Sequence, residues 1–400
     1  MSRNRIISVL LSVVLLLTAV TPALSAHAAG TKSDGGQNAH IAFKADGKLR
    51  ILQIADLQDD EVLDEAPRKL LQAAVEKTNP DLIVLTGDNI AGYDCPTKED
   101  AETAIRAFMD ILDVYNIPVA AVFGNHDDDR TPLTKEEQMN IYMSYPCFIG
   151  SKGVIASKTV GDNTMTNVGT YNIPVYAAAD SDQVLYNIWC FDSGRHNPDP
   201  AYGGYGYVLQ EQIDWYVHTS EALQAANGGQ LVPSIAFQHI VPPQIYSALK
   251  EIPIWLPGCV EEDGHYYVLP TGVNRLTNWL SESPCPPSPA FADGYKQLDA
   301  MIERGDVRAL FFGHDHVNHY IVPYKGVDLV SSAGCTYQSY NDQHQGFRLI
   351  TLDTADLQTY ETTYYSAVRL LSVSWFRLTA VELLHQLWNW IVAKTEDLFH

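Results

Sequence analysis

The sequence predicts an α/β fold with a mixed β-sheet, and three observations support this prediction. Its 400 residues are 46% hydrophobic, which is enough for one large domain or two smaller ones. In the first half of the chain, short apolar runs alternate with segments of helical length, as in βαβ units. Polar side chains of the metal-ligand type follow five of the apolar runs, and the carboxyl ends of strands are where an α/β sheet builds its site.

The predicted elements follow that alternation in order. Strands are expected at 49–55, 82–86 and 118–123, with helices at 63–78, 98–115 and 135–145. The first helix should end before Asn79-Pro80, because a proline disfavours helical backbone at the residue before it. Shorter β-rich segments are expected at 154–159, 171–177 and 184–191, followed by a helix at 211–226 and strands at 234–237 and 309–312.

The N-terminus has the pattern of an export signal. Arg3 and Arg5 precede the apolar stretch 6–20, and Ala26-His27-Ala28 offers a cleavage site between small residues. We therefore expect a signal peptide at 1–28, a polar linker at 29–40, a main domain at 41–364 and a secreted or cell-surface protein. An uncleaved segment that stays in the membrane is the alternative.

The last part of the chain, 365–400, predicts an amphipathic helix. Apolar residues line one face of 368–394, and Arg369, Arg377, Glu382 and His385 argue against a membrane-spanning helix. We expect this helix to pack on its own domain, and a peripheral membrane or dimer contact is the alternative. Three tryptophans support the alternative: Trp375, Trp388 and Trp390.

Two segments between predicted elements are unusually long, 194–207 and 251–293. Long loops in a compact domain are usually functional, so both are expected at the rim of the site, with a purely structural excursion as the alternative. The formal net charge of −22 argues against duplex nucleic acid or an anionic membrane as a charge-driven partner. Export permits disulfides among the six cysteines, but the sequence alone cannot choose their pairing.

The chemistry of the chain is concentrated in five polar segments. They are Asp56-Leu57-Gln58, Gly87-Asp88-Asn89, Gly124-Asn125-His126-Asp127, Gln238-His239 and Gly313-His314-Asp315-His316. Carboxylates, amides and imidazoles together suit a pair of borderline divalent metal ions. Taken singly, each segment could be an ordinary strand end, cap or turn. Five such segments in one order, each after a strand, indicate a metal-dependent hydrolase.

In this order, the five segments resemble the motif series of the calcineurin-like metallophosphoesterases, D-x-H, G-D-x, G-N-H-[DE], a lone H and G-H-x-H. They are most similar to the purple acid phosphatase-like secreted phosphatases, and the resemblance spans 49–364. It implies a sandwich of two facing mixed β-sheets flanked by helices. It also implies a secreted phosphatase that hydrolyses phosphomonoesters, with a phosphorylated small molecule or other phosphoester as its partner.

The resemblance implies a site for two divalent ions, such as Mn, Fe or Zn. The first would be held by Asp56, Gln58, Asp88 and His316. The second would be held by Asp88, Asn125, His239 and His314, so that Asp88 bridges the two. A hydroxide between the metals would attack phosphorus. His126 would contact the phosphate and protonate the leaving oxygen, and Asp127 would orient the His126 imidazole.

The chain departs from the family pattern at two positions. Gln58 stands where most members have histidine, which should weaken the first metal position and shift its preference away from zinc. Ala91 stands where purple acid phosphatases carry the tyrosine that binds ferric iron, and Tyr93 is displaced by two residues. We therefore expect no ferric, purple centre.

Two other functions remain open at the level of the sequence. A phosphodiesterase or nucleotidase would use the same metals, and Tyr202, Tyr205 and Tyr207 could stack a base. A metal-binding module without activity would need lost ligands, whereas only Gln58 is altered and His126 is retained.

Overall fold

The computed structural model describes residues 40–256, 259–272, 287–291, 295–337, 339–340 and 345–371. The predicted signal peptide (1–28), nearly all of the linker (29–40) and most of the predicted C-terminal helix (365–400) lie outside these residues. The 368–394 stretch proposed for membrane or dimer contact is described only through Leu371. Within the described ranges, no helix combines the length and the apolar character that crossing a membrane requires.

A five-stranded sheet carries the first three motifs. Its strands lie in the order β15 (Glu361–Ser366), β14 (Gly346–Asp353), β1 (Lys48–Ile54), β2 (Leu82–Thr86) and β3 (Val119–Val122). The strands β1, β2 and β3 are parallel to one another. On the other side of β1, β14 pairs antiparallel with β1, and the edge strand β15 pairs antiparallel with β14. The motifs after β1, β2 and β3 therefore emerge at the same end of the sheet.

A seven-stranded sheet carries the last two motifs. Its order is β12 (Ile321–Tyr324), β13 (Val327–Ser331), β11 (Val307–Phe312), β7 (Ser234–Phe237), β6 (Val184–Cys190), β5 (Asn163–Tyr176) and β4 (Val154–Val160). The central strands β13, β11, β7 and β6 are parallel, and the strands at both edges are antiparallel. Parallel centres with antiparallel edges make both sheets mixed, as expected.

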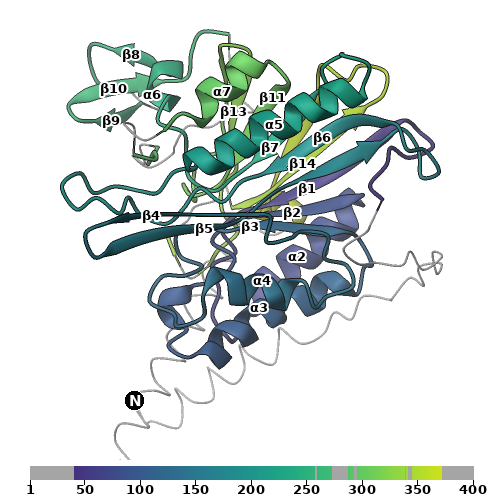
Figure 1. Ribbon diagram of the computed structural model, residues 1–400. Coiled ribbons are helices and arrows are strands. Elements are labelled where there is room, and N and C mark those ends of the chain that lie inside the picture. The colour runs from purple at the N-terminus through teal and green to yellow at the C-terminus, as the bar shows by residue number, and fades with distance from the viewer. Residues whose placement is uncertain are drawn as a thin grey trace, which may run out of the picture. The chain divides into compact units, whose positions relative to one another are not determined.

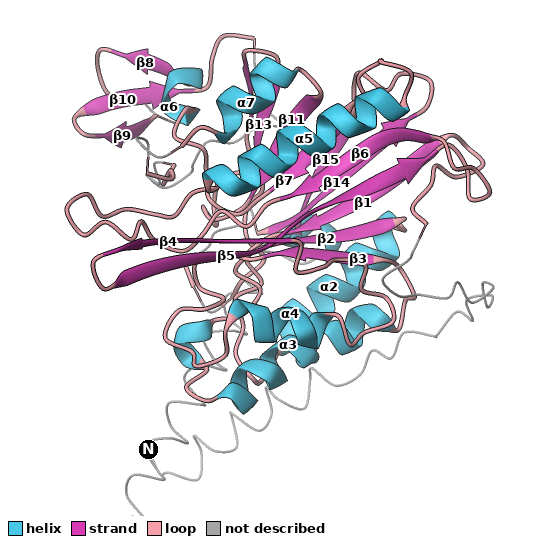
Figure 2. Cartoon of the chain, viewed as in Figure 1, coloured by secondary structure: helices cyan, strands magenta, loops and turns pink. Residues whose placement is uncertain are grey.

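The two sheets face each other, and helices cover their outer faces (Figures 1 and 2). The helices α2 (Glu65–Thr78), α3 (Lys98–Asp113) and α4 (Lys135–Tyr142) lie over the five-stranded sheet; α5 (Gln210–Ala226) and α7 (Gln297–Arg304) lie over the other. Between the sheets, a buried core joins residues such as Ile51 and Val84 to Ile235 and Phe311. Each helical layer has its own core. The predicted α/β sandwich is confirmed.

Local sequence explains where the helices begin and end. In α3, the Thr97 side chain accepts from the backbone N–H of Asp100, and the Asp100 side chain accepts from the N–H of Thr97, which is a capping box. The helix α2 ends at Asn79, which adopts the left-handed conformation (φ 42°) before Pro80. Because these signals are local, the predicted helix bounds differ from the observed ones by only a few residues.

The segment 251–293 differs from the expected long loop. It contains most of a three-stranded antiparallel sheet of β8 (Lys250–Ile252), β10 (His265–Val268) and β9 (Val260–Glu262), preceded by the short helix α6 (Ile245–Ala248). Short strands at the edge of the molecule have weak sequence signals. The strand β15 also continues to Ser366, two residues beyond the expected domain end at 364, and a one-turn helix α8 (Ala367–Leu370) follows it.

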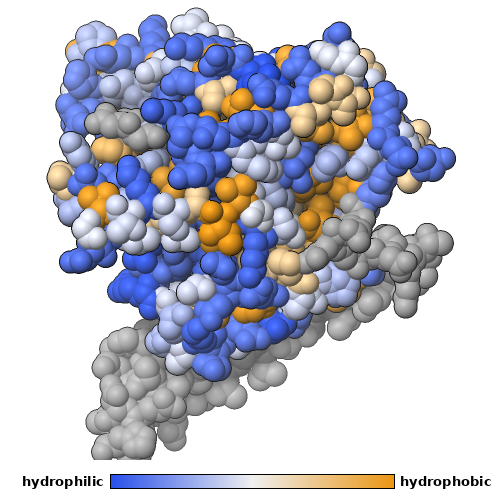
Figure 3. Space-filling view, viewed as in Figure 1, coloured by the Kyte–Doolittle hydropathy of each residue, from blue (hydrophilic) through white to orange (hydrophobic). Residues whose placement is uncertain are grey.

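The visible surface of the protein is mainly hydrophilic. Figure 3 shows mainly hydrophilic side chains on the visible face, with hydrophobic ones in small groups. A short run of exposed apolar residues, Ile254, Trp255 and Leu256, lies between β8 and β9.

Candidate metal centre

The candidate ligands occupy one recurrent position relative to their strands. Asp56, Asp88, His239 and His314 each stand two residues after the end of β1, β2, β7 and β11, respectively, and Asn125 stands three residues after β3. Because these strands are parallel and the two sheets face each other, all five side chains meet where the strand ends converge. The side chains of all seven predicted ligands lie in this region and are at least nine-tenths buried.

The backbone at the site is held in an unusual conformation. Asp56, Gln58, Asp88 and His314 have φ values of 52°, 47°, 48° and 76°, in the left-handed region that non-glycine residues rarely adopt. Such residues cluster at functional sites, where the surrounding structure holds them. Gly87 makes close packing possible, since a Cβ there would lie 2.7 Å from the backbone nitrogen of Gly124.

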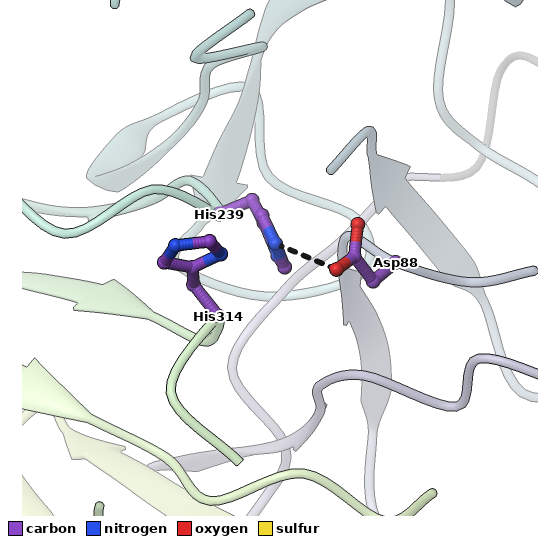
Figure 4. Close-up of side chains that lie close together, drawn as sticks. All are labelled: Asp88, His239 and His314. Atoms are coloured by element: carbon purple, nitrogen blue, oxygen red, sulfur yellow. Dashed lines mark ion pairs between the residues drawn. The ribbon is translucent and has the colours of Figure 1, made fainter. Parts of the chain in front are cut away.

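The ionisable side chains form two groups that share one residue. Ligand atoms of Asp88, His239 and His314 lie within 4.8 Å of one another, and so do those of Asp56, Asp88 and His316. Figure 4 shows the first group, with His239 facing Asp88. His239 Nε2 lies 3.1 Å from Asp88 Oδ2, and His316 Nε2 lies 3.6 Å from Asp56 Oδ1. The predicted bridging position of Asp88 is therefore the position at which the two groups overlap.

Hydrogen bonds to the backbone fix which ring nitrogen faces the centre. His239 Nδ1 lies 2.9 Å from the carbonyl oxygen of Thr86, and His316 Nδ1 lies 2.9 Å from that of Tyr340. A carbonyl can only accept, so each Nδ1 donates and Nε2 is the ring nitrogen that faces the centre. Burial lowers the pKa of His239, but the neighbouring Asp88 carboxylate raises it to about 9. The amide of Asn125 joins the group, because its Oδ1 lies 3.2 Å from His239 Nε2.

Three buried side-chain atoms of the predicted ligands have no hydrogen-bond partner among the described residues. They are Oε1 of Gln58, Oδ2 of Asp88 and Nε2 of His314. The other end of the Gln58 amide is occupied, since Nε2 donates to the hydroxyl of Tyr93 at 3.2 Å. Buried polar atoms are almost always paired in folded proteins, so unpaired atoms of this kind at one centre fit the binding of a cation.

The electrostatics of the site also fit a bound cation. Burial raises the pKa of Asp56 well above its ordinary value; the neighbouring His239 opposes this effect and Asp88 adds to it. Burial lowers the pKa of His316 to about 4 and that of His314 well below the ordinary value, so both imidazoles are neutral. Asp56 and Asp88 form ion pairs only with histidines in the part of the chain that the structure describes. Oxygen and imidazole donors without a lysine or arginine fit divalent metal ions.

His126 lies at the edge of this centre and is about one-third exposed. Its backbone N–H donates to Asp88 Oδ1 at 2.7 Å, which ties it to the shared carboxylate. The edge of the Tyr93 ring packs against its imidazole, with ring centroids 5.0 Å apart. The imidazole is therefore held beside the metal ligands and remains accessible from solvent.

The expected contact between Asp127 and the His126 imidazole is corrected by the structure. The two carboxylate oxygens of Asp127 accept from the backbone N–H groups of Asn89, Ile90 and Gly124, at 2.8, 3.1 and 2.6 Å. Neighbours in a turn point their side chains in different directions, so adjacency in sequence was a poor guide. The carboxylate beside the imidazole is Asp129, whose Oδ2 lies 3.5 Å from His126 Nδ1.

The loop 194–207 reaches the site through two residues. Arg195 Nη2 donates to Asp129 Oδ1 at 2.8 Å, and the ring of Tyr205 meets His314 edge-on, with centroids 4.3 Å apart. Tyr207, which the sequence suggested for base stacking, is 3% exposed and its hydroxyl accepts from Lys158. Tyr202 remains 65% exposed and packs near Phe291.

The segment 251–293 reaches the site through Ser288. Its backbone N–H donates to both carboxylate oxygens of the buried Asp315, at 3.2 and 3.4 Å. Asp315 stands between the candidate ligands His314 and His316, so this part of the chain is attached directly to the candidate metal centre. The sequence did not predict that Asp129 and Tyr93 contact His126, or that Asp315 accepts from Ser288. The only signal in the sequence was that all three stand close to candidate ligands.

A further buried ion pair, between Asp192 and Lys135, lies at a strand end and was not predicted from the sequence. Asp192 follows β6 by two residues, as the ligands follow their strands. Lys135 Nζ donates to its two oxygens at 3.1 and 3.0 Å, and the backbone N–H groups of Val168 and Gly194 donate to them at 2.7 and 2.8 Å. Burial lowers the pKa of Lys135, but Asp192 and nearby carboxylates raise it above the ordinary value.

Comparison with known proteins shows which family this chain resembles. The model of the family described as calcineurin-like phosphoesterase matches residues 49–318, more than half of the chain. Among curated proteins, "Probable inactive purple acid phosphatase 28" of Arabidopsis thaliana is 28% identical over 341 residues, which are 78% of this chain and 77% of that protein. "Probable inactive purple acid phosphatase 14" of the same plant is 26% identical over 326 residues, 75% of this chain and 73% of that protein.

Two further similarities are more distant. "Phosphatase DCR2" of Saccharomyces cerevisiae is 25% identical over 291 residues, which cover 69% of this chain and 45% of the yeast protein. A solved structure, a dimetal phosphatase from Danio rerio, aligns with a TM-score of 0.47 at 13% identity, covering 79% of this chain and 99% of that chain.

Proposed function

This chain belongs to the calcineurin-like phosphoesterase family, and on that premise we propose that it is an exported phosphatase that uses two divalent metal ions to hydrolyse phosphomonoesters. The observation that carries the proposal is the sharing of Asp88 between two groups of three ligand side chains. One carboxylate between two ligand groups is the arrangement that two adjacent cations require, because it offsets their repulsion.

The seven residues Asp56, Gln58, Asp88, Asn125, His239, His314 and His316 would hold the metals. When bound, two divalent ions supply the neutralisation of phosphoryl charge and the activation of water. The protein's own part is to aim the Nε2 atoms of His239 and His316 inward, through hydrogen bonds from Nδ1 to the carbonyl oxygens of Thr86 and Tyr340. The strained backbone at Asp56 and Asp88 places their carboxylates before any substrate arrives.

We assign His126 the role of donating a proton to the leaving oxygen and contacting the phosphate. Support comes from its place beside the shared carboxylate and its partial exposure. The Asp129 carboxylate near Nδ1 would stabilise the doubly protonated ring, whose Nε2 proton can be given to the leaving oxygen. Arg195 holds Asp129 in turn, which connects the rim loop to the acid.

A phosphodiesterase that accepts nucleotides is the second candidate. The observation that favours it is Tyr205, whose ring lies against the ligand His314 at the rim. The choice of a monoester as substrate rests on the family resemblance, and the burial of Tyr207 removes one of the three rings proposed for base stacking.

A metal-binding protein without turnover is the third candidate, because the A. thaliana relatives are named probable inactive. Against it, this chain retains a ligand-type side chain at all seven positions and keeps His126 at the edge of the centre. The altered ligand, Gln58, still presents an unpaired oxygen.

One assay separates these candidates. The protein is loaded with Mn²⁺, its metal content is measured, and turnover of an aryl phosphate is compared with that of the corresponding bis-aryl ester; metal-free protein is the control. Two metal equivalents with faster monoester turnover is the expected result. Faster diester turnover would favour the second candidate, and two equivalents without turnover of either ester would favour the third.

Export is part of the proposal and rests on the sequence of residues 1–28. The expected result is a mature protein outside the cell that begins after Ala28, read by N-terminal sequencing. Retention of the full-length chain in the membrane fraction would contradict cleavage. Removal of 368–400 tests the proposed membrane or dimer contact, because vesicle binding or dimer content should fall if that stretch makes it.

A further inference from the structure

Three candidate ligands share a feature beyond the atom that faces the centre. In His239 and His316, the nitrogen that does not face the centre donates to a backbone carbonyl. In Gln58, the atom that does not face the centre is the amide nitrogen, and it donates to the Tyr93 hydroxyl at 3.2 Å. In all three candidate ligands, the N–H group that faces away from the centre therefore donates a hydrogen bond to another group of the protein.

The backbone of Gln58 is held as firmly as its side chain. Its N–H donates to the carbonyl oxygen of Asp88 at 2.9 Å, its φ is 47°, and it is 1% exposed. With both ends fixed, the remaining freedom is a half-turn of the amide, which exchanges oxygen and nitrogen. A carbonyl oxygen attracts a cation and an NH₂ group repels it, so this half-turn decides whether Gln58 is a ligand at all.

Tyr93 is itself fixed to the site rather than to the surface. It lies in the turn η1 (Gly92–Asp94), where the N–H of Gly92 donates to the carbonyl oxygen of His126 at 3.0 Å. Its ring packs against the His126 imidazole, and the guanidinium of Arg130 lies over the ring, 5.7 Å from the centroid. The hydroxyl is thus held at a constant place beside the Gln58 amide.

We propose that Tyr93 is the positioning residue for Gln58, which keeps the amide nitrogen occupied so that the amide oxygen faces the first metal position. This inference rests on the proposed metal centre and deepens it. It gives the tyrosine a role without metal contact, unlike the iron-binding tyrosine expected at position 91 in purple acid phosphatases. Loss of the hydroxyl would leave a buried N–H group unpaired whenever the oxygen faces a cation, which would weaken binding roughly tenfold or more.

The test measures Mn²⁺ binding in four proteins: the wild type, Tyr93→Phe, Gln58→His and the double variant. Competition with a chromophoric chelator gives the dissociation constant of each position. Tyr93→Phe should weaken one position roughly tenfold and leave the other unchanged. Gln58→His should tighten that same position, because imidazole is the stronger donor.

The double variant decides the inference. In the Gln58→His background, Tyr93→Phe should change neither dissociation constant by more than about twofold, since no amide remains to be oriented. Tyr145→Phe is the matched control; it also loses one tyrosine hydroxyl bond, to Asp110 at 2.6 Å, but in the helical layer. It should leave both constants unchanged.

Two outcomes would overturn the inference alone: an unchanged constant in Tyr93→Phe, and an equal loss in both backgrounds. A wild type that binds fewer than two ions would overturn the proposed two-metal centre and the inference with it. The proposed function fails separately if two ions are tightly bound without turnover of any phosphoester. In that case the four binding measurements still decide the role of Tyr93.

Discussion

Two buried acidic clusters of this protein stand at the same kind of position and differ in their partners. Asp88 and Asp192 each lie two residues after a parallel strand, β2 and β6, and both are at most 1% exposed. At Asp192, a lysine and two backbone N–H groups satisfy the carboxylate. At Asp88, the charged neighbours are another carboxylate and imidazoles.

The difference teaches how to distinguish a structural charge from a functional one. A buried charge that the protein neutralises itself contributes to the fold and needs nothing from outside. A buried charge that is left next to unpaired acceptors, such as Gln58 Oε1, is prepared for a ligand. The metal-centre cluster and the Lys135–Asp192 pair should therefore respond to mutation in opposite ways.

The largest effect is expected at Asp88. Asp88→Asn should empty at least one metal position and lower turnover by roughly 10⁴-fold, or about 5.5 kcal/mol of transition-state stabilisation. Metal analysis and steady-state turnover measure the two quantities. Two full equivalents with normal turnover would rule out the bridging assignment.

The Lys135–Asp192 pair should show the reverse pattern. Lys135→Met leaves Asp192 charged, buried and without its cation, which should lower the free energy of unfolding by about 3–5 kcal/mol. Metal content per folded molecule should not change. Adding Asp192→Asn should recover part of the lost stability, because the uncompensated charge is removed. If Lys135→Met lost metal instead of stability, the distinction between the two clusters would collapse.

His126 tests whether the metal-centre cluster is catalytic as well as metal-binding. His126→Ala should keep both metals and slow the hydrolysis of alkyl phosphates by about 10²–10⁴-fold, the usual contribution of general acid catalysis. Activated aryl phosphates, whose leaving group hardly needs a proton, should be affected less. Steady-state rates on both substrate types measure the effect. An equal loss on both would reduce His126 to a phosphate contact.

The smallest effects separate the two acidic neighbours of His126. Asp127→Asn should lower the free energy of unfolding by about 1–3 kcal/mol, because an amide cannot accept from all three backbone N–H groups. Asp129→Asn should leave stability nearly unchanged and reduce alkyl phosphate turnover by roughly tenfold or less, since it faces the imidazole at 3.5 Å. Chemical denaturation and rate measurements on both variants check these effects. If Asp127 were the residue that orients His126, Asp127→Asn and not Asp129→Asn would lower turnover.

The sequence predicted the elements that carry periodic signals and the residues that carry chemistry. Strands such as Leu82–Thr86 were placed correctly because a continuous apolar run between turn residues has few other interpretations. Two other regions were predicted less well: β5 extends from Asn163 to Tyr176, well before the predicted start at 171, and the strands β8 to β10 were missed. The first residues of β5 and much of β8 to β10 are exposed, so their sequences lack a continuous apolar run.

The partners of the site residues were beyond the sequence for a different reason. Lys135 and Asp192 are 57 positions apart, and Arg195 and Asp129 are 66 apart, so no local pattern connects them. The left-handed backbone at Asp56 and His314 was equally invisible, because a sequence shows glycine preferences and not strain in other residues. Motifs therefore predicted which side chains gather at one place, while long-range contacts decide which neighbours each one has.

The backbone N–H of His314 donates to the Asp56 carboxylate across 258 positions of the chain. Contacts that distant form late in folding, because the loop between them must first lose most of its conformational freedom. A chain still emerging from the ribosome, or truncated before residue 314, would have the first motifs and no complete set of ligands. Metal uptake would then report that the chain has finished folding, and an incompletely folded chain would bind metal too weakly to begin chemistry.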